Sequence, residues 1–517
     1  MKRIIAGLLC AAVLLGILIG CGTETPSAYV PTGDGLTPDG VDVIGETQPQ
    51  ERDGFSMAYY QEEGFNPFTC INYTNRALFC LLYQGLFTVN SSYEARPILC
   101  RRYTVSESMH YYVFYLDENA TFSDGTKVTS EDVLASYDAA RESSVYKGRF
   151  THLREIKILE DGGIQFWMDT PYENLPILLD VPIVKASQID ARTPVGSGPY
   201  CVSSGLKTEM LAKVPRWWCS AALPLSASSI PLENVHSATE IRDGFEFGDI
   251  GVVCADPGAS SYADYRCDFE VWECDTGVFL YLVSNDKSEV FGKKRLCAEL
   301  TYAIDRDAIV DAYYHGFAHP ATLPASPLSP YYDTGLASGY YFDSEKFEQA
   351  VADNLLYEKK VVLLVNSGDT VRLKVARDIV RMLRDCGLDA QLRTARGDTY
   401  YYLMTTDEYD LYLGQTKMSA NMDLSAFYYP VGALSYASLE DDAIYDMALQ
   451  SLENNGNYYN LHKLSTEEGQ LVPILFQNYA VYAKRGLLTG MDPARDNIFY
   501  YDLGRGTEDA LFTPEAQ

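Results

Sequence analysis

Residues 360–393 carry the pattern that most constrains the fold of this chain. The run 360–365 (KVVLLV) is apolar and precedes the turn-forming residues 366–368 (NSG), as expected for a buried strand. Between 371 and 383 an apolar residue recurs at every fourth position, which predicts one buried helix face, and Gly387 closes the helix. Residues 388–393 then alternate like a second strand. This order predicts an α/β fold with parallel strand pairing.

The start of a second helix can also be recognised. Thr129 stands where a helix N-cap is expected, and Asp132, three residues later, occupies the capping-box position. Asp305 is expected to cap a further helix, which Gly316 would end. The remaining elements that we expect are strands at 112–116 and 409–413 and helices at 293–304 and 307–314.

The first twenty residues are typical of an export signal. Lys2 and Arg3 are followed by the uncharged, apolar segment 4–20. Leu18-Ile19-Gly20-Cys21 resembles the bacterial lipobox, in which the cysteine becomes the first residue of the mature chain and carries acyl groups. We therefore expect a signal peptide at 1–20 and lipidation at Cys21. A plain transmembrane anchor with an incidental cysteine is the alternative.

Residues 21–53 separate this anchor from the folded part. After Cys21 they are rich in Gly, Pro, Thr and Asp and lack apolar periodicity, so a flexible linker is expected. The chain beyond Phe55 is too long for one core, which predicts two or three lobes. The formal net charge of −30 disfavours nucleic-acid binding, because a strongly acidic surface repels phosphate backbones.

Cysteine and histidine spacing gives no sign of a metal site. The chain has 12 cysteines without any C-x-x-C spacing, and those in apolar surroundings, such as Cys80 and Cys297, are expected to be buried free thiols. Cys267 and Cys274 are close enough in sequence to form a disulfide in an exported protein. The six histidines show neither H-x-x-x-H nor H-E-x-x-H spacing, so no metal and no cofactor are expected.

Six short motifs follow one another along the chain. They are Asn66-Pro67-Phe68, 83–87 (YQGLF), 122–133 (FSDGTKVTSEDV), 194–200 (PVGSGPY), 302–306 (YAIDR) and 472–476 (VPILF). In this order, and behind a lipobox, they resemble the large extracytoplasmic solute-binding proteins of peptide and nickel ABC importers, the oligopeptide- and dipeptide-binding family. Most of them shape the backbone: Gly196 and Gly198 are expected to permit angles that side chains forbid.

The resemblance implies an α/β, periplasmic-binding-protein type II-like fold with two lobes and an inserted extra domain. The ligand would lie between the lobes, and hinge closure would bury it. Carried over to this chain, lobe I would comprise 54–89, 193–276 and 481–510, the inserted domain II 90–192, and lobe III 277–480.

The resemblance also implies a function. The chain would be a membrane-tethered, extracytoplasmic protein, expected to be a monomer, that delivers a peptide or peptide-like solute to the permease of an ABC importer. A ligand-sensing lipoprotein that feeds a receptor is an alternative with the same fold. An exported hydrolase is a further alternative, but neither a G-x-S-x-G elbow nor a zincin motif occurs, so we expect no enzyme.

Ligand contacts in the family come from the first loop of lobe I, from the segment after a strand of lobe III and from the late crossover. The residues that match these places, together with a tyrosine on a further candidate strand, are Asn72, Tyr73, Tyr281, Thr416, Lys417, Met418, Asp423, Phe476 and Gln477. Core packing is the alternative for Tyr73 and Tyr281, although a tyrosine suits a cleft wall through its ring and hydroxyl.

The segment after 409–413 departs from the peptide-binding pattern. Where family members have the aspartate that pairs with a peptide's α-amine, this chain has Ala420, and Lys417 stands where an aromatic residue would be. Loss of a buried carboxylate leaves an ammonium group unpaired, which costs on the order of 3–5 kcal/mol. We therefore expect cargo other than a free-amine dipeptide bound in the family's usual way. Lys417 facing solvent, or Asp423 replacing the lost aspartate, are the alternatives.

Overall fold

The computed structural model describes residues 54–204, 208–219, 221, 223, 225–262, 264–292, 296–406, 408–428, 434, 439 and 441–505. The predicted signal peptide, Cys21 and the linker lie outside these residues. None of the helices that the structure describes has the length and apolar character needed to cross a bilayer.

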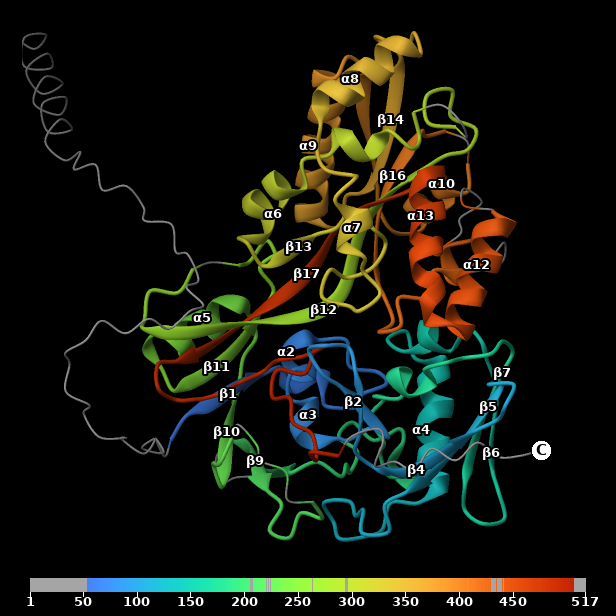
Figure 1. Cartoon of the computed structure of the whole chain (residues 1–517). Helices are drawn as coiled ribbons and strands as arrows, with labels where there is room; N and C mark the ends of the chain where they lie inside the picture. The colour runs from blue at the N-terminus through green and yellow to red at the C-terminus, as the bar shows by residue number, and fades with distance from the viewer. Residues whose placement is uncertain are drawn as a thin grey trace, which may run out of the picture. The chain divides into compact units, whose positions relative to one another are not determined.

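One sheet of eleven strands organises the fold (Figure 1). Its order is β15 (Asp389–Ala395), β14 (Lys360–Asn366), β16 (Leu411–Lys417), β12 (Phe269–Ser284), β17 (Leu471–Lys484), β11 (Ile250–Ala255), β1 (Ser56–Tyr59), β10 (Ser229–Asn234), β9 (Glu209–Lys213) and β8 (Tyr200–Ser204), with β13 (Ala318–Pro320) paired to β17 off this path. We call the β14–β16 end the distal half and the β11–β8 end the proximal half.

The long strands β12 and β17 connect the two halves. They pair antiparallel from Phe269 opposite Lys484 to Val283 opposite Leu471. On the distal side β12 also pairs with β16, and on the proximal side β17 pairs with β11. The β12–β17 register shifts between Asp275 and Val278, where Gly277 has a positive φ of 67°. The connection therefore contains an irregularity where the halves meet.

The predicted strand–helix–strand unit is confirmed in the distal half. β14 and β15 pair in parallel, and α9 (Thr370–Asp385) connects them. Asp369 caps α9 by accepting a hydrogen bond from the backbone N–H of Arg372 at 2.9 Å. The apolar positions of α9 at every fourth residue are buried, as the sequence pattern predicts. The strand expected at 409–413 is β16, which begins at Leu411.

A separate four-stranded antiparallel sheet is formed by residues that follow β1 and precede all other strands of the large sheet. It consists of β4 (Cys100–Val105), β5 (Tyr111–Leu116), β7 (Ile164–Met168) and β6 (Leu153–Ile158). The helix α4 (Ser130–Glu142) packs against it through Tyr137, whose ring meets that of Phe166 edge-on at 4.9 Å. Both hydrogen bonds of the predicted capping box between Thr129 and Asp132 are present. We call these strands and α4 the inserted part.

The remaining secondary structure surrounds these sheets. It comprises the β2 (Phe87–Val89)–β3 (Ala95–Pro97) pair and the helices α2 (Tyr73–Arg76), α3 (Phe79–Leu82), α5 (Ala238–Phe247), α6 (Arg306–Tyr314), α7 (Thr334–Ala337), α8 (Ser344–Asp353), α10 (Gly397–Met404), α11 (Ser425–Tyr428), α12 (Asp442–Glu453) and α13 (Tyr458–Glu468).

Two local expectations need correction. The helix expected at 293–304 is wrong for its described part, where turns lead into a 3-10 segment at Leu300–Ala303. The carbonyls of Thr301 and Ile304 accept hydrogen bonds from the buried Arg306 guanidinium at 3.0 and 3.2 Å, so the segment is satisfied without an α-helical ladder. The cap at Asp305 is confirmed by its bond with the N–H of Ala308.

The second correction concerns the glycines of the 194–200 motif. Neither has a positive φ, so unusual backbone angles are not the reason for them. A Cβ at Gly196 would lie 2.2 Å from the carbonyl oxygen of Leu82, and one at Gly198 would lie 2.4 Å from that of Leu81. Glycine is needed here because another backbone passes too close for any side chain.

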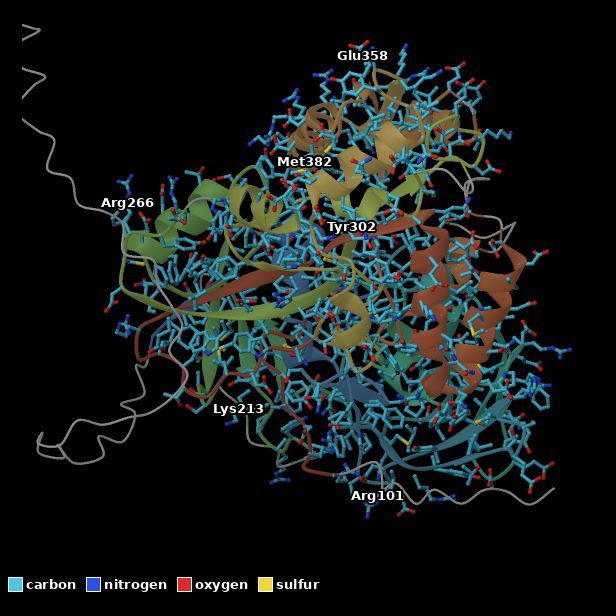
Figure 2. All side chains as sticks on the ribbon, turned by 45° about the horizontal axis from the view of Figure 1, so that its top comes forward. Arg101, Lys213, Arg266, Tyr302, Glu358 and Met382 are labelled. Carbon is cyan, nitrogen blue, oxygen red and sulfur yellow. The ribbon has the colours of Figure 1, made fainter. Side chains whose placement is uncertain are left out.

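The ten cysteines between Cys70 and Cys386 are free thiols, including Cys267 and Cys274. Figure 2 shows how charged side chains cover the periphery, with Arg101, Lys213, Arg266 and Glu358 among the exposed ones. Single surface charges of this kind contribute little to stability.

His462 on α13 is a titratable side chain that is completely buried. Neither of its ring nitrogens has a hydrogen-bond partner among the described residues. Burial lowers the pKa of His462 to about 4, although Asp333 opposes the shift. The imidazole is therefore neutral in the folded protein at pH values where an exposed histidine is partly charged.

We predict that His462 makes the fold sensitive to acid. Between pH 6.5 and 4 the unfolded chain takes up a proton at this residue and the folded chain does not, so stability falls as the pH falls through this window. The full loss in the free energy of unfolding is about 3 kcal/mol, and the His462→Leu variant should not show this loss. Urea unfolding at pH 7, 5.5 and 4.5 measures the difference from wild type. The partly exposed His110, changed to Gln, is the control, and an unchanged pH slope in His462→Leu would contradict the prediction.

Candidate ligand-binding site

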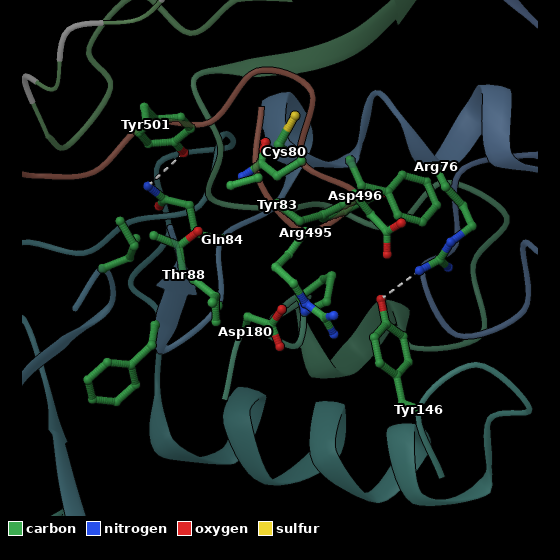
Figure 3. A pocket seen from close by; sticks show the side chains of 18 of the residues that line it. Arg76, Cys80, Tyr83, Gln84, Thr88, Tyr146, Asp180, Arg495, Asp496 and Tyr501 are labelled. Carbon is green, nitrogen blue, oxygen red and sulfur yellow. Dashed lines mark hydrogen bonds between the residues drawn. The ribbon is translucent and has the colours of Figure 1, made fainter. Parts of the chain in front are cut away.

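A cavity of about 120 Å³ lies where three parts of the chain meet (Figure 3). Its walls come from the segment 76–98 around α3 and β2, from residues 146–182 after α4, and from the C-terminal segment 494–501. The last strand, β17, ends at Lys484, so this C-terminal segment returns across the fold after leaving the large sheet. The cavity thus joins residues that are more than 400 positions apart in sequence.

The cavity is lined by an unusual concentration of charge. Arg149 forms an ion pair with Asp180, and both side chains are largely buried. Arg76 donates hydrogen bonds to the hydroxyl of Tyr146 at 3.3 Å and to the carbonyl oxygen of Cys70 at 3.1 Å. Figure 3 shows the Arg76–Tyr146 bond beside Asp180 and Arg495.

A tight turn presents Arg495 and Asp496 to this region. Ala494 and Asn497 bond to each other through both backbone pairs, at 3.0 and 2.8 Å, which leaves the two residues between them with φ of 44° and 68°. Positive φ at residues other than glycine costs of order 1–3 kcal/mol each and persists where surrounding structure enforces it. Here the N–H of Asp496 donates to the carbonyl of Asp275 at 2.9 Å.

Lys417, at the end of β16, reaches this turn from the distal half. Its ammonium forms an ion pair with Asp496, and about a third (33%) of its side chain is open to solvent. Removal from bulk water and the positive charges of Arg495 and Arg76 act to lower the pKa of Lys417. Lys417 therefore lies at the edge of the cavity, in contact with the lining residue Asp496. The next residue, Met418, is buried, and its carbonyl accepts a bond from Arg495 at 3.0 Å.

Asp423 lies beside His152, the residue that directly precedes β6. One of its oxygens lies 3.7 Å from Nε2 of His152, and the other accepts the N–H of Ser425 at 2.8 Å. Its side chain is 13% exposed. Ala420, at the place of the family's aspartate, is buried. Asp423 is therefore engaged at the start of α11 and not with Lys417.

A second, smaller cavity of about 50 Å³ lies beside Tyr73. Tyr73 packs against Tyr479 with 5.5 Å between ring centres, and Asp256 is a further wall of this cavity. Burial raises the pKa of Asp256 to about 6, although hydrogen bonds from the N–H of Gly258 and from the amide of Gln477 oppose the rise. The structure thus brings Tyr73 and Gln477 near a carboxyl group that can hold a proton at mildly acidic pH.

The other residues named from the sequence lie elsewhere. Asn72 caps α2 by accepting the N–H of Asn75. Thr416 pairs with Phe279 in the sheet. Tyr281 and Phe476 are 2% and 0% exposed, and both pack in an aromatic cluster around Phe279. The sequence did not single out Arg76, Arg149, Asp180, Asp256 or Arg495.

The fold and a charged cavity at the junction of its parts define the class of a two-lobed solute-binding protein. Residues 94–437 match the family model described as bacterial extracellular solute-binding proteins, family 5 Middle. This match covers more than half of the chain, which therefore belongs to this family.

Relatives are distant in sequence. The chain is 23% identical over 351 residues to Protein XP55 of Streptomyces lividans, covering 63% of this chain and 64% of that protein. It is 22% identical over 281 residues to the glutathione-binding protein GsiB of Escherichia coli K12, covering 52% and 54%. The matches thus span less than two thirds of these relatives. Among solved structures, the ABC transporter substrate-binding protein CtaP of Listeria monocytogenes is 16% identical, with a TM-score of 0.68 over 87% of this chain and 98% of that chain.

Proposed function

We propose that this chain captures a small solute outside the cytoplasm and delivers it to the permease of an ABC importer. It acts as a carrier and not as a catalyst. Family membership supports the class, and the observation that carries the proposal is the charged cavity lined by Arg76, Arg149 and Arg495, at whose edge Lys417 of the distal half pairs with the lining residue Asp496. A peptide-like solute is the substrate class that we propose, in keeping with the relative that binds glutathione.

Closure would occur about the β12–β17 connection. These two strands run through both halves, and their pairing is irregular between Asp275 and Val278, next to the Lys417–Asp496 contact. A packed strand pair with a local irregularity can bend there while each half moves as a rigid body. We propose lobe I at 54–89, 193–276 and 481–510, domain II at 90–192 and lobe III at 277–480, with the four-stranded sheet inside domain II.

Among the residues proposed from the sequence, Lys417 and Met418 have the strongest structural support as ligand contacts. Tyr73 and Gln477 would contribute from the smaller cavity beside Asp256. Asp423 would act through its position at α11. Asn72, Thr416, Tyr281 and Phe476 line neither cavity and would support the site from behind its walls.

We predict that a lysine at position 417 is required for tight solute binding. Lys417→Met removes the partner of Asp496 at the edge of the cavity, so the dissociation constant of peptide-like solutes should rise about tenfold or more. Isothermal calorimetry with a library of dipeptides and with glutathione measures this. Lys359→Met, at an exposed lysine outside the cleft, is the matched control. Tight dipeptide binding that Asp423→Ala abolishes and Lys417→Met leaves intact would refute this assignment.

We also propose that the mature chain is held at the membrane by lipid on Cys21, with 22–53 as its tether. Two or more acyl chains are needed for stable anchoring, which a lipidated N-terminal cysteine supplies. Cys21→Ala should move the protein from the membrane to the soluble fraction and remove the acyl mass, whereas Cys10→Ala should change neither. Membrane-bound, unacylated Cys21→Ala protein would show that the apolar segment 4–20 anchors the chain instead.

A further inference from the structure

The charged cavity has a sign opposite to that of the whole protein. The chain carries a formal net charge of −30, yet the cavity lining includes three guanidinium groups and only two carboxylates. They are Arg76, Arg149 and Arg495, and Asp180 and Asp496. An acidic protein that concentrates guanidinium groups at an internal cavity creates a local positive field there.

We infer that this cavity binds an oxyanion group of the solute, a carboxylate or a phosphate, with Arg76 as its principal partner and Arg495 as the second. The inference rests on the proposed solute-binding function and names the chemical group that the solute must carry.

Arg76 is the cation whose charge remains uncompensated. Its hydrogen bonds go to the carbonyls of Pro67 and Cys70 and to the hydroxyl of Tyr146, and among the described residues no carboxylate pairs with it. The guanidinium also lies over the rings of Phe79 and Tyr146, at 5.2 and 5.6 Å from their centres. Neutral acceptors and aromatic faces fix the orientation of this group without neutralising it.

The carboxylates nearby are already engaged. Asp180 pairs with Arg149, and Asp496 pairs with Lys417. Asp275 accepts bonds from the hydroxyl of Tyr93 and, at 2.8 Å, from the N–H of Gly277. None of the three is therefore left for Arg76, and an external oxyanion is the partner that its charge lacks.

Arg495 is prepared for the same role. Its side chain is 8% exposed and its Nη1 is buried without a hydrogen-bond partner among the described residues. The positive-φ turn holds it over the ring of Tyr93, at 5.4 Å from the centre. Two fixed guanidiniums in a partly dry cavity suit a planar carboxylate or a phosphate better than a neutral amide, because each can donate paired N–H bonds to charged oxygens.

Two tryptophans make the cavity observable. The ring of Trp217 meets that of Tyr501 at 5.6 Å, and Nε1 of Trp218 donates to the side-chain oxygen of Gln84 at 2.8 Å. Both partners line the cavity. Occupation should therefore change the intrinsic tryptophan fluorescence.

The test titrates the mature chain with matched probes, followed by fluorescence and calorimetry. The probes are Ala-Ala-Ala and its C-terminal amide, glutathione and its diethyl ester, and inorganic phosphate. At least one oxyanion probe should bind saturably. Comparing the affinity for phosphate with the affinities for the carboxylate probes shows which group is preferred. Loss of the carboxylate, by amidation or esterification, should weaken binding about tenfold or more.

Arg76→Gln should weaken the binding of the oxyanion probes to a similar extent and leave the binding of the neutral analogues unchanged. Arg242→Gln, at an exposed arginine on α5, should behave like wild type. Since Arg76 also holds the 67–70 loop, the acid-against-amide comparison on the wild-type chain provides a test that needs no variant. Neutral analogues that bind as tightly as the acids would overturn the inference and leave the carrier function standing. Absence of binding by every probe, charged or neutral, would count against both.

Discussion

The antiparallel pairing of β12 with β17 is the interaction on which the rest of the structure depends. Through it the parallel β14–β16 unit and the β1–β11 unit share one sheet. The register shift beside Gly277 places a backbone irregularity where the two halves join. Residues at this place, including Met418 and the 494–497 turn, consequently belong to the connection and to the candidate site at once.

Electrostatics distinguishes this cleft from the surface around it. Isolated ion pairs on the periphery, such as Arg242–Asp243, are exposed and contribute little. In the cavity, by contrast, charges are partly removed from water, so each pairing matters more and an unpaired cation is costly. Arg149 and Lys417 have carboxylate partners, and Arg76 has neutral ones. A ligand that supplied a negative charge to Arg76 would be stabilised by the same low dielectric that makes an unpaired cation unfavourable.

The features that could be predicted from the sequence are local ones. The capping box at Thr129 and the strand–helix–strand unit at 360–393 depend on residues a few positions apart, and both were correct. The helix expected at 293–304 failed because Arg306, buried and bonded to Thr301 and Ile304, competes with helical hydrogen bonding. The local sequence pattern does not show that the side chain of Arg306 will donate hydrogen bonds to the carbonyls of residues that precede it.

The candidate site was harder to predict because it depends on contacts between residues far apart in sequence. Arg76, Arg149 and Arg495 come from three distant segments, and their meeting depends on the path of the chain after β17. The one signal available was the departure from the family pattern at Lys417, and the structure places Lys417 against Asp496 at the edge of this cavity. Tyr281, in contrast, lies in the aromatic core. Because the chain has 40 tyrosines, a single tyrosine is a weak indicator of a ligand contact.

Native mass spectrometry of the mature chain purified from its own cells, without refolding, tests the central claim most directly. We expect a fraction of the protein to carry a small solute with a carboxylate or phosphate group, which is released on unfolding and is absent from an Arg76→Gln preparation that remains folded. A mass that matches the acylated chain alone in every gentle preparation, or a bound solute without any acidic group, would contradict it.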